Sequence, residues 1–322
     1  MWRRRSTPRL CAMALAVAMA APASAFSPEI LDSVVAVLPE WPGYPRGRAP
    51  AGRHGEAPEG SAVAVRPGGY LATNVHVLAR ARRVSIRLDD GRLIPANIVG
   101  LDAATDIALL KVARDLPVPP LGPEPGLADR VCVVGNPFGL GLSVTCGVVS
   151  AVHRTGMGFN PIEDFIQTDA VVNPGASGGA LVDADGRLIG MVSAIFTKGT
   201  DANIGVNFAA STALVMRVVD DLIRHGRVIR ARAGWRVRDL TDAERSAHTG
   251  VRITAISPSG SAERAGLKPG DLVTAVGERR IVRSSDLKSA IELHRPGDRI
   301  EVRVTRSDGA RVVQLKLDGP RS

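Results

Sequence analysis

The stretch "NPGASGGALVD", Asn173 to Asp183, sets one serine, Ser177, among glycines and other small residues. Serine is a poor nucleophile unless a neighbouring base removes its proton and a third group holds that base. Glycines beside such a serine allow backbone N–H groups to converge on one point, because they carry no Cβ. A tight turn without any catalytic role has the same composition, so a base and a carboxylate must be found elsewhere in the chain.

Two further stretches supply these groups. "YLATNVHVLARAR" places His76 after a β run and before a short helical pattern, and "LDAATDIALLKV" places Asp106 directly before an apolar strand. Asp102, four residues before Asp106, is the weaker candidate for the carboxylate. The chain order His76, Asp106, Ser177 is the order of chymotrypsin-type enzymes and differs from the subtilisin and α/β-hydrolase orders. We therefore expect these three residues to form a catalytic triad, with the N–H groups of Gly175 and Ser177 as oxyanion donors.

The segment "GASGG" also matches the G-x-S-x-G elbow of α/β hydrolases, an alternative that would make the protein an exported esterase. Such an elbow opens a helix. Here Ser177 is followed by "GALVDADGRLIGMVSAI", whose pattern indicates two strands around an Asp-Gly turn. The local context therefore disfavours the hydrolase alternative.

Short apolar runs separated by turn residues dominate the chain from Ser61 to Ala210 and predict a mainly β domain of barrel or sandwich type. The pattern changes in "STALVMRVVDDLIRHGR", where apolar residues recur at helical spacing. We expect a helix over 211–226, with Ser211 or Thr212 as its N-cap and Gly226 as its stop. This helix closes the first domain, 26–228, and leads to a second domain over 229–319.

The first residues have the plan of a cleavable secretory signal over 1–25: four arginines, a short apolar run and the small-residue site "ASA" before Phe26. An uncleaved N-terminal anchor is the alternative, although the run is short for a membrane span. We therefore expect an exported, for example periplasmic, protein without a stable membrane span. Residues 38–60, rich in Pro, Gly and Arg, predict a flexible surface loop.

The net charge of +9 is concentrated in the leader and in the second domain, which holds 19 Lys and Arg against 12 Asp and Glu from Arg230 onward. Aromatic residues are nearly absent there, and the arginines alternate along predicted strands. This pattern indicates a solvated basic face and argues against nucleic-acid binding. The sequence has no CxxC, no HExxH and no paired Cys/His spacing, so we expect no metal site and no cofactor.

Cys132 and Cys146 are the two cysteines outside the leader. They flank the turn of "VCVVGNPFGLGLSVTC", which predicts a hairpin that places them opposite each other. In an oxidising compartment they can form a disulfide, and two buried thiols are an equally good interpretation.

Taken together, the motifs resemble the HtrA/DegP family of trypsin-like serine proteases with a PDZ domain. The resemblance rests on "GSAVAVRPGGYLATNVHVL", "TDIALLKV", "GNPFGLGLSVTCGVVSAVHRTG", "DFIQTDAVVNPGASGGALVDADGRLIG" and "IGVNFAAS". It implies a chymotrypsin-like double β-barrel followed by a small α+β PDZ domain. The family usually has Asn before the nucleophile and Pro after the second following glycine, where this chain has Ala176 and Ala180.

Carried over position by position, the resemblance makes His76 the general base, Asp106 its orienting partner, Ser177 the nucleophile, and Gly175 with the Ser177 amide the oxyanion donors. It also implies a substrate cleft formed by Ser193, Ala194 and Ile195 along one strand, with Val171, Gly205 and Val206 at the S1 pocket. Val171 stands six residues before the nucleophile, where trypsin-type enzymes place the acid that binds Lys or Arg. An apolar residue there implies small or medium apolar P1 side chains.

The second domain contains "GVRITAISPSGSAERAGLKPGDLVTAVGERRI", which resembles a PDZ domain. Such domains add an extended C-terminal peptide to a sheet edge and capture its carboxylate with backbone amides. The corresponding loop is "RAGW", made of Arg232, Ala233, Gly234 and Trp235. The predicted helix from Ser284 to Leu293 forms the other wall of the groove.

The leading hypothesis is an exported endoprotease that cleaves unfolded or damaged proteins, with a PDZ domain that binds peptide C-termini. The family implies a homotrimer. The alternative is a chaperone-like or peptide-binding protein whose catalytic site rests or is weak.

Overall fold

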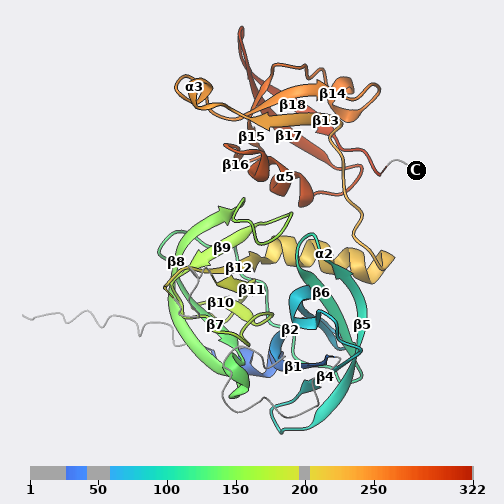
Figure 1. The fold of residues 1–322 in the computed structure, drawn as a ribbon, viewed down its shortest axis with the longest axis vertical. Helices are drawn as coiled ribbons and strands as arrows, with labels where there is room; N and C mark the ends of the chain where they lie inside the picture. Colours follow the sequence, from blue (N-terminus) through green and yellow to red (C-terminus); the bar gives the residue numbers. More distant parts are fainter. Residues whose placement is uncertain (1–26, 42–58, 196–203, 321–322) are drawn as a thin grey trace, which may run out of the picture.

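The computed structural model describes residues 27–41, 59–195 and 204–320. Within them the chain forms two closed six-stranded β-barrels and a smaller sheet domain above them, joined by helix α2 (Figure 1). This architecture confirms the predicted mainly β class, a chymotrypsin-like double barrel followed by a PDZ-type domain. The predicted signal segment, 1–25, lies outside the described residues.

The first barrel is antiparallel throughout and closes where β1 (Val34–Glu40) pairs with β4 (Arg83–Arg87). In barrel order its strands are β1, β2 (Gly60–Arg66), β3 (Tyr70–Asn74), β6 (Ile107–Val112), β5 (Leu93–Asp102) and β4. The short helices η1 (Pro28–Ser33) and α1 (Val75–Leu78) precede β1 and follow β3.

The second barrel has the same strand plan. Its strands, in barrel order, are β10 (Ala180–Asp183), β11 (Leu188–Ile195), β12 (Asn207–Ser211), β9 (Phe165–Thr168), β8 (Ser143–Arg154) and β7 (Arg130–Gly135). A 3-10 turn, η2 (Pro137–Gly139), joins β7 to β8. The serine at 177 is thus followed by strands β10 and β11 and not by a helix, which contradicts the α/β-hydrolase alternative.

The C-terminal domain is one antiparallel sheet with short helices at its side. Its strands run in the order β13 (Trp235–Asp239), β14 (Val251–Ile256), β15 (Leu272–Val276), β17 (Arg299–Arg306) and β18 (Gly309–Lys316), with β16 (Arg279–Arg280) paired to β15. The helices are α3 (Asp242–Arg245), α4 (Ser261–Arg264) and α5 (Ser284–Glu292).

Helix α2 (Thr212–His225) lies between the barrels and the C-terminal domain, where the sequence places it (Figure 1). The Ser211 hydroxyl caps its first turn by accepting a hydrogen bond from Leu214 N, and Gly226 ends it in the left-handed conformation. Its apolar side chains join one large hydrophobic cluster with residues of both barrels. Burying that stripe holds the two barrels against each other, because neither barrel covers the cluster alone.

Two strands were missed by the sequence analysis. β1 includes Leu38–Glu40, assigned above to a loop over 38–60, and Gly60 at the other end begins β2. The misassignment has a physical reason: Pro39 and Glu40 pair with β4, and such pairing far along the chain leaves no local signal. The remainder of that predicted loop, 42–58, lies outside the described residues. The other missed strand, β9, has only four residues.

The C-terminal domain contacts the barrels through its helix α5. The Thr155 hydroxyl donates to Asp286 Oδ1 at 2.6 Å, and Lys288 Nζ donates to the carbonyl of Pro161 at 2.7 Å. Thr155 and Pro161 belong to the connection between β8 and β9. One helix of the C-terminal domain is therefore fixed to one loop region of the second barrel.

A buried carboxylate, Asp164, joins the two domains next to that loop. Arg279 of β16 donates to its Oδ2 at 2.9 Å, Ser211 donates to the same atom at 2.6 Å, and His153 Nδ1 lies 3.4 Å from Oδ1. Burial alone would raise the pKa of Asp164, but the hydrogen bonds from His153, Arg279 and Ser211 outweigh it and hold the pKa well below its usual range. Asp164 is therefore ionised at neutral pH.

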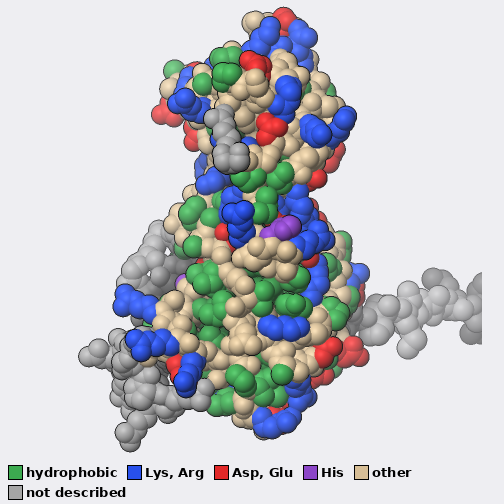
Figure 2. Space-filling view, turned by 90° about the vertical axis from the view of Figure 1, so that its right-hand side faces the viewer, with side chains coloured by type: hydrophobic (Ala, Val, Ile, Leu, Met, Phe, Trp, Pro, Cys, Tyr) green, Lys and Arg blue, Asp and Glu red, His purple; other side chains and the backbone are tan. Residues whose placement is uncertain are grey.

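Lys and Arg side chains are interspersed with Asp and Glu over the upper domain on the face shown in Figure 2. Several of the arginines pair with acidic neighbours, as Arg306 does with Asp271 at 2.6 Å. This distribution agrees with a solvated basic surface. Among the described residues, no helix combines the length and the hydropathy that a membrane crossing needs.

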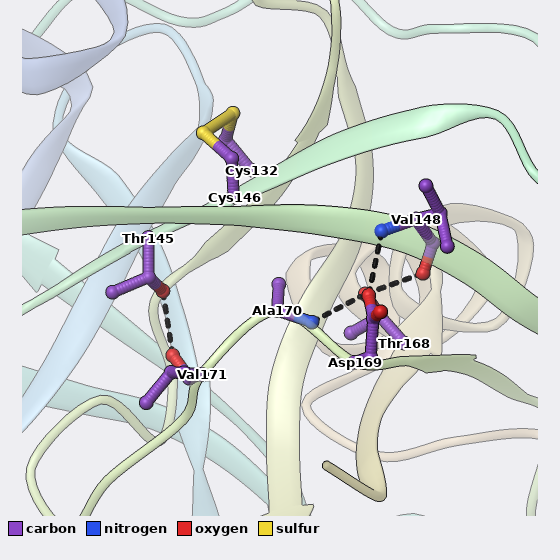
Figure 3. Close-up of a disulfide and its surroundings, with 8 residues drawn as sticks. All are labelled: Cys132, Thr145, Cys146, Val148, Thr168, Asp169, Ala170 and Val171. Atoms are coloured by element: carbon purple, nitrogen blue, oxygen red, sulfur yellow. Dashed lines mark hydrogen bonds between the residues drawn. A yellow bond between two sulfur atoms is a disulfide. The ribbon is translucent and has the colours of Figure 1, made fainter.

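Cys132 and Cys146 face each other across β7 and β8 and form a disulfide. This settles the choice that the sequence left open between a disulfide and two thiols. Cys132 is buried and Cys146 is exposed. Next to the disulfide, the Thr145 hydroxyl donates to the carbonyl of Val171, and Val148 N donates to Asp169 at 2.7 Å (Figure 3).

We expect replacement of both cysteines, Cys132→Ala with Cys146→Ala, to lower the free energy of unfolding. The disulfide closes a loop with a sequence separation of 14, and cross-linking a loop of this size restricts the unfolded chain by about 3 kcal/mol. Urea unfolding of the oxidised protein and of the double variant measures the difference. A reductant should destabilise only the wild type; equal stability of all samples would contradict the expectation.

We expect Asp164→Asn to destabilise the protein by about 3–5 kcal/mol at neutral pH, because it removes the charge that His153 and Arg279 contact. The folded-state pKa of Asp164 lies below the unfolded value of 3.8, so its stabilisation is complete above that value and is lost as the pH falls towards the folded pKa. Urea unfolding between neutral pH and pH ~3 should therefore show a gap between wild type and variant that is constant at first and narrows below 3.8. Asp89→Asn, at an exposed turn, serves as the control; a gap that widens in acid would refute this account.

Candidate active site

His76 and Asp106 form a close pair at the seam between the barrels. His76 Nδ1 donates to Asp106 Oδ2 at 2.6 Å, and the backbone N–H of His76 donates to Oδ1 at 2.9 Å. Half of the His76 side chain is exposed, whereas the Asp106 side chain is 12% exposed. A buried carboxylate on Nδ1 orients the ring and leaves Nε2 free to accept a proton.

The backbone of Asp106 is held as firmly as its carboxylate. Its φ of 59° lies in the left-handed region, which Asp tolerates better than most residues. Its carbonyl accepts hydrogen bonds from Val75 N and from Asn74 Nδ2, both at 3.1 Å. β3 with α1 presents His76 and the start of β6 presents Asp106, so adjacent paired strands fix the distance between them. Asp102, by contrast, accepts from Thr105 and Arg230 and does not serve His76.

The loop that carries Ser177 passes too close to its neighbours for side chains at two glycines. A Cβ on Gly178, which has a φ of 84°, would overlap the carbonyl oxygen of Ser61. A Cβ on Gly179 would overlap the carbonyl oxygen of Val134. Strand β2 of the first barrel and β7 of the second therefore both touch this loop, which explains why the sequence has glycine at these positions.

Two backbone N–H groups of this loop, those predicted from the sequence as oxyanion donors, have no hydrogen-bond partner among the described residues. Among the described residues, neither Gly175 N nor Ser177 N donates a hydrogen bond to a protein acceptor. The N–H between them, on Ala176, is occupied by the carbonyl of Asn173 at 3.0 Å. Such a pair of unpaired donors, Gly175 and Ser177, is suited to bind a developing negative charge.

Ser177 lies against the strand that leads to His76. The carbonyl of Ser177 accepts from Ser61 N at 2.8 Å, and a Cβ on Gly178 would approach the hydroxyl of Thr73, three residues before His76. Within the described part of the chain, Ser177 Oγ forms no hydrogen bond with His76. Catalytic hydrogen bonds are often long without substrate and tighten in the complex, so Ser177 and His76 stay the predicted nucleophile and base.

The residues expected to form the substrate cleft lie on three segments of the second barrel. Ser193, Ala194 and Ile195 end β11, which pairs with β12 and has an irregular register at Ser193. Ser193 is buried, and the side chains of Ala194 and Ile195 are outside the described residues.

The residues expected at the S1 pocket differ in their exposure. Val171 is 45% exposed, and its carbonyl is held by Thr145 next to the disulfide (Figure 3). Gly205 has a φ of 77°, and Val206 packs against the cluster between the barrels. The described surface at the predicted S1 position thus offers an apolar side chain.

The loop Arg232–Trp235 precedes the edge strand β13. Arg232 is tied by two backbone hydrogen bonds of 2.9 Å to Asp318, and its side chain is exposed. Ala233 is buried, and Gly234 has a φ of 74° that glycine adopts without strain. Trp235 begins β13, which pairs with β14 on one side and has α5 near its other side. An edge strand beside a helix is the arrangement that PDZ domains use to bind extended peptides.

Two residues that the sequence analysis did not single out contact the serine loop. Ser61 Oγ donates to the carbonyl of Gly175 at 2.8 Å, and Phe138 N donates to the carbonyl of Pro174 at 2.7 Å. Ser61 is a polar residue within the apolar run "GSAVAV", and this was the available signal for a buried hydroxyl with a specific partner. Nothing local distinguishes Phe138, since it acts through its backbone.

Comparison with known proteins finds two families, one for most of the barrels and one that begins before β12 and α2 and includes the C-terminal domain. Residues 60–191 match the family described as "Trypsin-like peptidase domain", and residues 203–317 match "PDZ domain". The serine endoprotease DegS of Escherichia coli is 35% identical over 269 residues, which is 80% of this chain and 76% of DegS. The chain belongs to the HtrA/DegP family of serine endoproteases.

Other members of the HtrA/DegP family are about equally similar. A protein of Chlamydia pneumoniae named "Probable periplasmic serine endoprotease DegP-like" is 37% identical, over 81% of this chain and 55% of that protein. The chain thus spans about half the length of this relative. Among solved structures, "HtrA-type protease AlgW with tripeptide" is 35% identical, has a TM-score of 0.69, and covers 91% of this chain and 96% of that one.

We expect Gly178→Ala to destabilise the protein by about 2–5 kcal/mol for two reasons. Alanine is strained in the left-handed conformation of this position, and its Cβ would overlap the carbonyl oxygen of Ser61. Gly158→Ala is the matched control, since Gly158 has a similar φ of 90° and open space around its Cβ position. It should cost only about 1–2 kcal/mol. Thermal and urea unfolding of both variants measure the difference; equal losses would show that the close approach at Gly178 does not matter.

Proposed function

We propose that the protein is an exported serine endoprotease that cleaves unfolded or damaged proteins through His76, Asp106 and Ser177. The observation that carries the proposal is the 2.6 Å His76–Asp106 pair beside a serine loop with two free N–H groups. Membership of the HtrA/DegP family, whose relatives are named serine endoproteases, supports the same activity.

In this mechanism Ser177 Oγ attacks the substrate carbonyl carbon while His76 Nε2 takes the hydroxyl proton. Asp106 holds the ring and stabilises the imidazolium. The N–H groups of Gly175 and Ser177 bind the oxyanion, and the proton on His76 then passes to the departing amine as the C–N bond breaks. His76 then takes a proton from water as the water oxygen attacks the acyl carbon, and His76 gives this proton to Ser177 Oγ as the acyl C–O bond breaks. The apolar Val171 favours small or medium apolar P1 side chains.

The C-terminal domain is proposed to bind peptide C-termini beside β13. A peptide added to this edge would lie between β13 and α5, with its carboxylate at the amides of the Arg232–Trp235 loop. The α5 wall also contacts the barrels, through Asp286 and Lys288. A homotrimer, implied by the family, stays a prediction.

Export from the cytoplasm is supported by two independent features. The relatives of known name include proteins called periplasmic, and the Cys132–Cys146 disulfide is of a kind that persists in oxidising compartments. We infer that the arginine-rich segment before "ASA" acts as the export signal.

We expect the protein to hydrolyse unfolded casein and Ser177→Ala to lose the activity by on the order of a million-fold, to background. Ser150→Ala, at an exposed serine of β8, is the matched control and should keep full activity. A phosphonate probe directed at nucleophilic serines should label the wild type and Ser150→Ala, but not Ser177→Ala. Peptides with a free C-terminal carboxylate, compared with amidated ones, test whether the C-terminal domain stimulates cleavage.

Absence of both cleavage and labelling in the wild type, with and without peptides, would overturn the protease assignment and favour the chaperone-like alternative. Cleavage that persists in Ser177→Ala would instead show that another residue, or a contaminant, carries the reaction.

A further inference from the structure

Ser61 is a fully buried serine at the start of β2, between the two barrels. All of its polar groups are used. Its Oγ donates to Gly175 O at 2.8 Å and accepts from Asn136 N at 2.9 Å, its N–H donates to Ser177 O at 2.8 Å, and its carbonyl accepts from Thr73 Oγ1 at 2.7 Å. Two of these four bonds end on the carbonyl groups of Gly175 and Ser177, the two proposed oxyanion donors.

The direction of the Ser61 hydroxyl is determined by its neighbours. Because Asn136 N–H points at the oxygen of the hydroxyl, the hydroxyl hydrogen is left for the carbonyl of Gly175. Asn136 itself is held from several sides. Its Nδ2 donates to Glu59 Oε2 at 3.0 Å, its Oδ1 accepts from Gly141 N at 2.8 Å, and Glu59 pairs with Arg87 of β4 at 3.0 Å. A hydrogen-bonded chain therefore runs from the first barrel to the serine loop.

The bond to Gly175 controls backbone groups that glycine would otherwise leave free. A peptide unit is planar, so fixing its carbonyl also fixes the N–H on its other side. Phe138 N fixes the Pro174–Gly175 peptide and thus the N–H of Gly175. Ser61 Oγ holds the carbonyl end of the following peptide, Gly175–Ala176, whose N–H end donates to Asn173 O at 3.0 Å, and this peptide links the two donors. Gly175, with a φ of 97°, lacks the Cβ that would restrict its rotation.

The residue before the nucleophile cannot supply this constraint from its own side chain. Ala176 carries only a methyl group, which is buried in the apolar cluster of the second barrel. A side-chain tether for the loop must therefore come from another segment. Among the described residues, Ser61 is the side chain that hydrogen-bonds to the carbonyl of Gly175.

We propose that Ser61 is a positioning residue for peptide-bond hydrolysis: its hydroxyl locks the Gly175–Ala176 peptide so that Gly175 N–H and Ser177 N–H stay aimed at the oxyanion. The inference rests on the proposed function and deepens it. Ser61 touches neither the substrate nor the reacting atoms, and it acts through the carbonyl of Gly175.

The test compares Ser61→Ala with Ser33→Ala, which removes a hydroxyl from another buried serine of the same domain. Hydrolysis of a short peptide amide gives kcat and KM for each variant. Inhibition by a peptide aldehyde measures the affinity for a tetrahedral adduct that carries an oxyanion. A product peptide gives the affinity for a ground-state ligand. Loss of one oxyanion donor costs about 100- to 1,000-fold in kcat, so a misaligned pair should cost about 10- to 100-fold.

The expected result for Ser61→Ala is a loss in kcat at nearly constant KM, with an equal loss in aldehyde affinity and unchanged binding of the product peptide. The pH dependence of kcat/KM should stay that of the wild type, because Ser61 contacts neither His76 nor Asp106. If Ser61 served stability alone, Ser61→Ala would lower the melting temperature but would not reduce the aldehyde affinity relative to the affinity for the product peptide. That result, or unchanged kinetics in an active enzyme, would overturn the inference.

Ser61→Cys guards against a variant that does not fold. It keeps the shape of the serine side chain with a somewhat larger atom in place of the oxygen, and its thiol is a weaker donor and acceptor. We therefore expect kcat and aldehyde affinity to fall to values between those of wild type and Ser61→Ala. If Ser61→Cys had the kcat and the aldehyde affinity of the wild type, the result would count against a role for the hydrogen bond. A wild type that neither cleaves the substrate nor reacts with the serine probe would overturn the proposed function, and the inference with it. If the wild type is active, the Ser61 variants test the inference alone.

Discussion

The site depends on how closely the loop of residues 173–179 passes behind strand β2. Ser61 N donates to Ser177 O, and a side chain at Gly178 would overlap the carbonyl oxygen of Ser61. That approach joins a strand of the first barrel to the loop of the second, so both barrels hold Ser177 in place. Ser61 thus binds the carbonyl groups of Gly175 and Ser177, whose own N–H groups have no hydrogen-bond partner among the described residues.

The seam between the barrels serves stability and chemistry together. Helix α2 and inward-facing strand residues bury one continuous apolar cluster there, and this burial fixes the relative positions of the barrels. At the edge of the cluster, Asp106 is held by its carbonyl and by its carboxylate, and it holds His76 in turn. Groups held in advance need no reorganisation when charge develops, and this is the main way in which such a site lowers a barrier.

The junction with the C-terminal domain is largely polar, although Leu293 packs against the apolar cluster between the barrels. Asp164, ionised and buried, accepts from Arg279 of that domain, and helix α5 contributes Asp286 and Lys288 to the contact. Because α5 is also the predicted wall of the peptide groove, a ligand beside β13 would contact an element that touches the β8–β9 connection. Interfaces of this kind rest on a small number of charged contacts and change more readily than apolar cores.

Local pattern alone was sufficient for much of the fold and for the candidate triad. The apolar runs predicted most strands, the helical spacing with Ser211 and Gly226 predicted α2, and the order His76, Asp106, Ser177 indicated the type of chemistry. Each of these rests on a residue's own position in a strand, a cap or a turn. Part of β1 was assigned to a loop, because its partner β4 lies far away in the chain, and β9 was missed because it has only four residues.

What the sequence by itself determined was the residue types that the chemistry requires and the glycines that a close backbone approach requires. Only the tertiary structure decided which contacts hold them: the Asp102 carboxylate goes to Arg230 while Asp106 goes to His76, and Cys132 bonds to Cys146. It also decided that a hydroxyl from β2 pins the loop beside Ala176. The physical reason is that a hydrogen bond between residues more than a hundred positions apart leaves no periodic trace, since it depends on how two separately formed barrels meet.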